Sequence, residues 1–392
     1  MSKGKKWLGT VTVVSLSVGL YAGLLTGVAH ADYQPSPTDV VGIGGSTPQY
    51  ELDFGANGDI AGDLGYNAAN NVNKLVTFDA TGDANGRDAY ADGSTLAAPV
   101  LLDPTVVLRA GTSPVQRPQS SSNAISALLA DTGAVEKISF AASASEPTAA
   151  NQTTASHNNW TFLHVVEIGT DPEEIVADST TNAPAGLSIA ELLGIYKGTY
   201  TQWNQLPNNS SGSSDTIIPL LPVASSSITK TFLADLKTQN GGTAPTLSAA
   251  VKTVEQNDPT AITSLPAAQS VDAIVPFSNG RLNLYGSGYF LNPVTVFPGG
   301  SPISAGVKAL TATAPDASAG YTDVNTLYVI FRQTDATSTT PWQPGSSQNW
   351  VQALFSDPSG PPPFFATPAG KALVAAAGAT ANYQDLGDVS NG

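Results

Sequence analysis

Short loops rich in serine and threonine recur where a strand-like segment ends and a helix-like segment begins. They lie at 43–47 (IGGST), 119–122 (QSSS), 142–145 (ASAS) and 225–228 (SSSI). A helix start leaves backbone N–H groups unpaired and carries a partial positive charge. Several such starts that converge, each with hydroxyl donors, would bind a small anion without many cationic side chains. The same hydroxyls would also serve as simple N-caps, and the pattern alone leaves both interpretations open.

Residue types needed for other chemistry are scarce. The sequence has no cysteine, which excludes disulfides, thiolate metal sites, cysteine nucleophiles and a thioether-linked lipid anchor. It contains no nucleophile elbow, H-E-x-x-H motif or phosphate-binding P-loop. His164 lies in an apolar run and is expected to pack within a strand, and Glu173 and Glu174 are expected in a solvated turn or helix start. We therefore expect no enzymatic activity, no cofactor and no metal ion.

Composition limits the possible partners and the size of the fold. Of 392 residues, 41% are hydrophobic and 12% are charged, so the chain can bury a substantial core. The length favours two domains or two large lobes. There are 16 basic and 31 acidic residues, giving a net charge of −15. This balance excludes a non-specific nucleic-acid binder, which needs a basic surface.

The first 31 residues have the features of a secretory signal peptide. Lys3, Lys5 and Lys6 precede an apolar run at 7–28, and 29–31 (AHA) form a small-x-small cleavage site. We therefore predict residues 1–31 to be a signal peptide and the protein to be secreted. The apolar run is close to membrane-spanning length, so an uncleaved membrane anchor is the alternative.

Strand-like and helix-like segments alternate through the rest of the chain, which predicts an α/β fold with a mostly parallel sheet. The predicted strands are 40–44, 73–78, 104–109, 136–141, 160–168, 216–223, 272–277 and 326–332. The predicted helices are 120–131, 188–196, 229–237, 350–355 and 369–377. Ser188 and Glu191 have capping-box spacing at the start of the second helix.

The order and wording of several segments resemble the phosphate-binding branch of the secreted substrate-binding proteins of ABC importers, in the form common in actinobacteria. The matching segments are 44–49 (GGSTPQ), 78–82 (FDATG), 117–122 (RPQSSS), 139–145 (SFAASAS), 191–206 (ELLGIYKGTYTQWNQL), 225–228 (SSSI), 254–262 (VEQNDPTAI) and 272–282 (DAIVPFSNGRL). Each motif is weak by itself, and together they are specific for the family.

The resemblance implies a two-lobed type II periplasmic-binding-protein-like fold, with two crossover strands and a ligand cleft between the lobes. Residues 38–168 and 318–392 would form lobe one, and residues 169–317 would form lobe two. The crossovers would be the strands at 160–168 and 326–332. Ligands of open α/β sheets bind at the carboxyl ends of the strands, where the serine-rich loops lie.

The resemblance also implies the ligand-binding residues, which come from both lobes. They are Gly45, Ser46, Thr47, Arg117, Ser121, Ser122, Ser143, Ser225, Ser226 and Ser227. The sequence departs from the family at several of these loops. Ser46 replaces an acidic residue, Ala142 and Ser145 replace arginines, and glycines are lost at Ser225 and Ser227. Loss of arginine removes a charge-assisted contact to an oxyanion.

Two functions are compatible with these features. The first is an extracellular solute-binding protein that captures a small oxyanion, phosphate by family default, between its lobes and delivers it to an ABC permease. The second is a surface or interaction protein on a degenerate solute-binding fold, with a cell-wall or surface partner. The altered anion loops and the absence of a lipid anchor favour the second function, which is kept as the alternative. The first function is the prediction.

Overall fold

The computed structural model describes residues 34–59, 61–69, 72–78, 105–116, 120–285 and 306–389. Residues Pro35–Gly392 form one compact unit. The predicted signal peptide, Arg117 and the segment at 79–82 lie outside the described residues. Within the described ranges, no helix has both the length and the apolar character needed to cross a bilayer.

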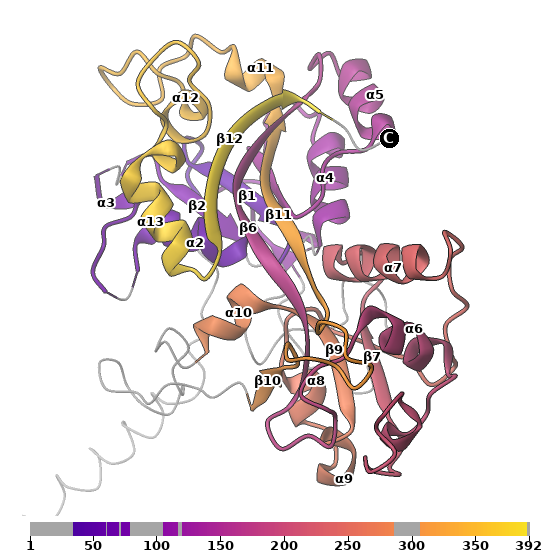
Figure 1. Ribbon diagram of the computed structural model, residues 1–392. Coiled ribbons are helices and arrows are strands. Elements are labelled where there is room, and N and C mark those ends of the chain that lie inside the picture. Colours follow the sequence, from indigo (N-terminus) through magenta and orange to yellow (C-terminus); the bar gives the residue numbers. More distant parts are fainter. Residues whose placement is uncertain are drawn as a thin grey trace, which may run out of the picture. The chain divides into compact units, whose positions relative to one another are not determined.

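One mixed sheet runs through the described chain, and most of its strands are labelled in Figure 1. Its strand order is β2-β1-β5-β11-β6-β9-β7-β8, and β10 and β12 pair with β6. The strands are β1 (Val40–Gly44), β2 (Leu75–Phe78), β5 (Phe140–Ser143), β6 (Leu163–Asp178), β7 (Ile218–Pro222), β8 (Lys252–Val254), β9 (Ala273–Ser278), β10 (Val307–Ala309), β11 (Thr322–Arg332) and β12 (Thr380–Asp388). A separate pair joins β3 (Thr105–Val106) to β4 (Val115–Gln116).

The sheet is less parallel than the sequence predicts. β1 is parallel to β2 and β5, and β7 is parallel to β8 and β9. The two groups are joined through β6 and β11, which run antiparallel to each other and to their neighbours β9 and β5. The reason is that the chain passes between the lobes twice in opposite directions, so the two crossovers pair as antiparallel strands.

The crossover strands are also longer than predicted. β6 continues from Leu163 to Asp178, so Glu173 is buried in the sheet, and the prediction of a solvated turn or helix start at 173–174 is wrong. The Asn325 amide donates a hydrogen bond of 3.0 Å to the Glu173 carboxylate, and burial raises the pKa of Glu173 well above its usual value. A neutral, hydrogen-bonded glutamic acid is tolerated within a strand, and charge patterning does not reveal it.

The five predicted helices lie close to their predicted positions, and the other helices of the described residues were not predicted. The longer helices are α2 (Gln49–Asn57), α4 (Ser121–Ala130), α5 (Ala149–His157), α6 (Ile189–Lys197), α7 (Ser227–Gln239) and α13 (Pro368–Ala376). The shorter ones are α3 (Tyr66–Ala69), α8 (Thr260–Thr263), α9 (Ala267–Ser270), α10 (Asn279–Leu284), α11 (Gln333–Ala336) and α12 (Trp350–Leu354). The predicted five are α4, α6, α7, α12 and α13. Ser188 and Glu191 form the predicted capping box of α6, whose C-cap Gly198 has φ +78°.

The larger hydrophobic clusters of the described residues draw on separate parts of the chain. Two clusters draw on residues 40–168 and 327–379. Two others draw on residues 175–321. A smaller cluster joins Leu284 of α10 to Tyr50 and Phe54 of α2 and to Leu373 of α13. The names lobe one and lobe two are kept below for the residue ranges given above, and the small cluster contributes an apolar contact between them.

Candidate functional site

The first serine-rich loop begins where β1 ends. The Gly45 N–H donates to the Ala142 carbonyl at 2.9 Å, which ties this loop to the end of β5. A Cβ atom on Gly45 would lie 3.1 Å from Ser121 Oγ, so the loop also contacts the start of α4. Ser121 Oγ in turn accepts a hydrogen bond from the Ala144 N–H at 2.9 Å. Three of the four predicted loops therefore meet at the carboxyl ends of β1 and β5.

The helix that follows the fourth predicted loop, α7, contacts this group from lobe two through one lysine. Lys230 Nζ, in the first turns of α7, donates to Ser122 Oγ in the first turn of α4. Ser226 is the N-cap of α7, and its side chain accepts from the Thr229 N–H. Figure 1 shows α7 beside the lower end of α4. The starts of two helices, one from each lobe, are thus linked by a lysine side chain.

Ser46 and Thr47 contact lobe two directly. The Gln256 amide donates to Thr47 Oγ1 at 2.9 Å, and the Asn257 amide donates to Ser46 Oγ at 3.4 Å. Arg281 Nη2 donates to the Ser46 carbonyl at 2.7 Å. Ser46 and Thr47 are buried. These two hydroxyls therefore hold the lobes together, whereas the sequence predicts them to face a ligand.

The Ser143 hydroxyl also makes its hydrogen bonds within its own loop. Its hydroxyl donates to the Ser145 carbonyl and accepts from the Ser145 N–H at 3.0 Å. The side chain is fully buried at the end of β5. Ser143 thus shapes the turn that presents Ala144 to Ser121, and its hydroxyl has no proton left for a ligand.

Several buried polar atoms near the two helix starts lack a hydrogen-bond partner within the described part of the chain. They are Ser120 Oγ, Ser225 Oγ, Gln49 Oε1 and Gln49 Nε2. Ser120 precedes α4, Ser225 precedes the α7 N-cap, and Gln49 is the first residue of α2. A buried polar group without a partner costs free energy, so such atoms mark places where a ligand or water completes the structure.

Ser120 also has a strained backbone. Its φ of 70° and ψ of 160° fall in a region that is essentially restricted to glycine. Ser120 therefore holds a backbone conformation that is typical of glycine. Strain of this kind is held by the surrounding structure and concentrates at functional sites.

A buried carboxyl group lies behind the first loop. Burial raises the pKa of Glu51 in α2 well above its usual value, and the charge of Asp171 raises it further. Burial also raises the pKa of Asp171 to about 6, although Ser278 and the Gly280 N–H donate to it. Arg281 is the cation of this group, and its guanidinium lies 3.7 Å from the centroid of the Tyr50 ring. A protonated Glu51 leaves the positive charge of Arg281 less compensated near Ser46.

A model of the PBP superfamily domain matches residues 79–356. This chain belongs to the PBP superfamily. The family match and the strand order together confirm the predicted α/β, type II periplasmic-binding-protein-like fold with two crossover strands.

Several solved structures are similar to this PBP superfamily chain. A putative phosphate ABC transporter substrate-binding protein from Clostridium perfringens is 12% identical with a TM-score of 0.49, and the match covers 88% of this chain and 99% of the other. An ABC-type phosphate transport receptor from Vibrio cholerae is 13% identical with a TM-score of 0.44, covering 87% and 99%. A phosphate-binding protein from Stenotrophomonas maltophilia is 15% identical with a TM-score of 0.41, covering 76% and 80%. The comparison with curated proteins found no match.

Sequence reasoning missed the polar residues that join the lobes of this superfamily member. Gln256, Asn257 and Arg281 lie outside the serine-rich loops, and only the resemblance of their segments hinted at a role. Lys230 carried a stronger signal. A lysine in the first turns of a helix opposes the helix dipole, so its place there calls for another reason.

Proposed function

We propose that this protein binds a small oxyanion between the first turns of α4 and α7, with phosphate as the first candidate because of the resemblance described above. The contact between Lys230 and Ser122 is the observation that carries this proposal, since it joins two helix starts from different lobes beside a cation. Ser121, Ser122, Ser225, Ser226 and Ser227 are the binding residues from these turns. Gly45 supports them by allowing the first loop to approach Ser121 closely.

The physical basis is the local field at the two helix starts. The unpaired N–H groups of α4 and α7 and their partial positive charges attract an anion despite the net charge of the chain. Lys230 adds a cationic side chain at an exposed position, and partial desolvation lowers its pKa because the charged form is disfavoured. A bound oxyanion would restore that charged form, so the lysine and the ligand stabilise each other.

We further propose the role of a secreted capture protein that delivers its ligand to an ABC permease. The predicted signal peptide at 1–31 and the family support this role. Binding requires no covalent step, and the described loops provide hydrogen-bond donors rather than a nucleophile paired with a base. Closure of the two lobes over the ligand would signal the loaded state to the permease.

Isothermal titration calorimetry with phosphate, sulfate and nitrate tests the proposal. The wild-type protein should bind at least phosphate, and Lys230→Met should weaken that binding about tenfold or more, because a charge-assisted contact is lost. Lys237→Met is the matched control, since this lysine is exposed in the last turn of the same helix. It should bind as the wild type does.

Two results would reject the site. One is the absence of binding heat with all three anions, and the other is equal affinity in Lys230→Met and wild type. Ser226→Glu gives an independent check, because a negative side chain at the α7 N-cap should abolish binding of a like-charged ligand.

A second function is favoured by the direct contacts between the lobes. Gln256, Asn257 and Arg281 use protein atoms to bridge Ser46 and Thr47, where the sequence predicts ligand contacts. A superfamily member held closed in this way would serve as a surface or interaction protein with a cell-wall or surface partner. Absence of oxyanion binding, together with an unchanged closed form in solution scattering, would support this alternative.

A further inference from the structure

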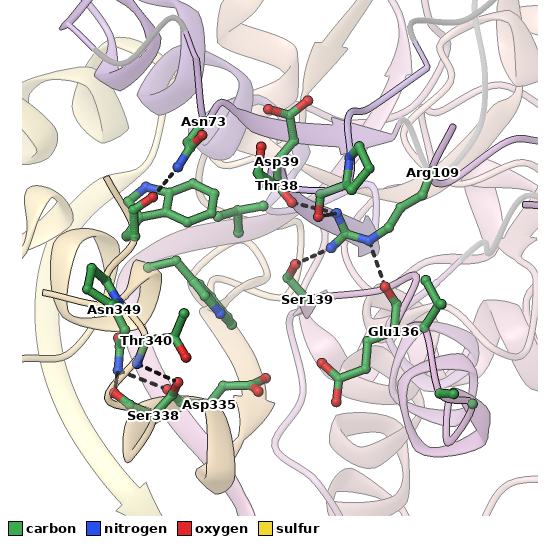
Figure 2. Close-up of a pocket in the computed structure, with 18 residues that line it drawn as sticks. Thr38, Asp39, Asn73, Arg109, Glu136, Ser139, Asp335, Ser338, Thr340 and Asn349 are labelled. Atoms are coloured by element: carbon green, nitrogen blue, oxygen red, sulfur yellow. Dashed lines mark hydrogen bonds between the residues drawn. The ribbon is translucent and has the colours of Figure 1, made fainter. Parts of the chain in front are cut away.

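A cavity lies in lobe one, at the edge of the sheet opposite the serine-rich loops. It has a volume of about 520 Å³. Its walls come from the segment before β1, the segment before β5 and the chain that follows β11. β1 and β5 are parallel and Phe331 of β11 pairs with Phe140 of β5, so these three segments share one edge. Figure 2 shows its labelled residues around the hollow.

Carboxylates outnumber cations in the lining. Asp39, Glu136 and Asp335 are the acidic residues, and Arg109 is the one basic residue among those that line the cavity. Arg109 is engaged in the wall itself. Its guanidinium donates to the backbone carbonyls of residues 36, 37, 39 and 136 and to Ser139 Oγ, as Figure 2 shows in part. These hydrogen bonds hold the segment before β1 in place and leave the Arg109 guanidinium unavailable to a ligand.

The side-chain amides that line the cavity likewise donate to backbone carbonyls of the protein. The Asn349 side chain donates to the carbonyls of Asp335 and Ser338 at 3.0 and 2.8 Å. Asn73 donates to the Trp342 carbonyl. The polar groups that remain are mainly acceptors, so a suitable ligand must bring hydrogen-bond donors.

Two of the carboxylates are incompletely compensated. Asp335 Oδ2 is buried and has no hydrogen-bond partner among the described residues, and the nearest cation is Arg332, whose Nη1 lies 3.5 Å away. The same nitrogen lies 3.5 Å from Glu136 Oε2, and the Glu136 side chain is 50% exposed. Burial raises the pKa of Asp335 to about 7, although Arg332 opposes this shift. The Arg332 guanidinium also pairs with Asp131 at 3.2 Å, so one buried cation is shared by three carboxylates, and a further cation would stabilise Glu136 and Asp335.

Two tryptophans, Trp342 and Trp350, complete the lining. Both are partly exposed. The indole N–H of Trp342 already donates to the Tyr66 hydroxyl at 2.7 Å, so this ring offers its aromatic surface rather than a donor. Aromatic faces beside carboxylates attract ammonium and guanidinium groups.

We propose that this cavity is a second ligand site, which binds an organic cation: an alkyl guanidinium or alkyl ammonium group held between Glu136 and Asp335 beside the two tryptophans. The cation brings the donors that the wall lacks and compensates both carboxylates. Its source is either a free amine or a basic side chain of a peptide. The site is distinct from the oxyanion site, since the two lie at opposite edges of the lobe-one sheet.

Calorimetry at low and physiological salt tests this site in the whole protein, with agmatine as the free guanidinium, 1,4-diaminobutane as the free amine and acetyl-Gly-Arg-Gly-amide as the peptide. At least one of them should bind, more weakly at higher salt. Glu136→Gln and Asp335→Asn should each weaken binding about tenfold. Asp63→Asn, an exposed carboxylate of lobe one outside the lining, is the matched control and should leave binding unchanged.

The outcomes separate the source of the cation from the existence of the site. Tighter binding of the free cations indicates a small-molecule ligand, tighter binding of the peptide indicates a basic side chain, and both support the proposal. No heat with any of the three probes would overturn it, as would equal or tighter binding of N-acetylglucosamine. Unchanged affinity in Glu136→Gln would also overturn it, and because this side chain is half-exposed the variant should fold. Lys230→Met should bind the cations as wild type does.

Discussion

At the start of α4, in the proposed oxyanion site, some features of single residues could be predicted from the sequence and others could not. The serines at 120–122 were predictable as helix-start donors because hydroxyl residues after a strand are typical of this position. The backbone strain at Ser120 was not predictable, because it depends on how the loop contacts β5 and Gly45. Likewise, the partners of Ser46 and Thr47 come from residues about 210 positions away, and no local pattern encodes that contact.

Replacing Ser120 with glycine should stabilise the fold. The φ of 70° and ψ of 160° at this position cost a serine on the order of 1–3 kcal/mol, and glycine avoids most of that cost. Part of the gain is lost because glycine has more freedom in the unfolded chain. We expect a net increase of about 1 kcal/mol in the free energy of unfolding, measured by urea denaturation.

Ala127→Gly is the control for this substitution. Ala127 lies in the interior of α4, where glycine should destabilise the helix by about 1 kcal/mol. Loss of stability in both variants would show that the backbone at Ser120 is not strained.

Elements were predicted well where a local signal marks their ends. The helix at 189–197 has a serine N-cap, a glutamate three residues later and a glycine C-cap, and its bounds differ by one residue from the prediction. The strand β12 was not predicted, because its sequence lacks strong alternation and its stability comes from pairing with β6. The crossover β6 was predicted too short, since Asp171, Pro172 and Glu173 interrupt its apolar pattern.

The capping box of α6 should contribute measurably to stability. Ser188 Oγ accepts from the Glu191 N–H and donates to Asp316 at 2.6 Å. Ser188→Ala should therefore lower the free energy of unfolding by about 1–2 kcal/mol. Ser211→Ala, at an exposed position of the same lobe, should change it by less than about 0.5 kcal/mol. Equal stability of the two variants in urea denaturation would contradict this assignment.

The molecule as a whole carries buried acids in both lobes and at their junction. Burial raises the pKa values of Glu51 and Glu173 well above normal, that of Asp171 to about 6 and that of Asp335 to about 7. The burial of these groups could not be predicted from the sequence, because it results from the crossover strands and from contacts between the lobes. Because all of these pKa values are raised, the groups should change the stability of the protein in the same direction as the pH changes.

Stability should fall as the pH rises from about 4 to about 7. An acid whose pKa is raised by folding binds its proton more tightly in the folded state, so the folded state holds more protons than the unfolded state over this range. Each rise in pH then favours unfolding until the folded-state acids have lost their protons. The free energy of unfolding should be larger at pH 5 than at pH 8.

Urea denaturation across this range measures the free energy of unfolding at each pH. Glu173→Gln should make its pH dependence shallower, because glutamine does not titrate and one of the buried acids is lost. Greater stability at pH 8 than at pH 5 would mean that these carboxyl groups are not buried as described.

The proposed function depends on an oxyanion bound between the starts of α4 and α7. A crystal structure grown with arsenate tests this binding, because anomalous scattering locates the arsenic atom. We expect an arsenic peak within hydrogen-bond reach of the first turns of α4 and α7 and beside Lys230. A peak confined to other positions, or none at an arsenate concentration that saturates binding in solution, would contradict it.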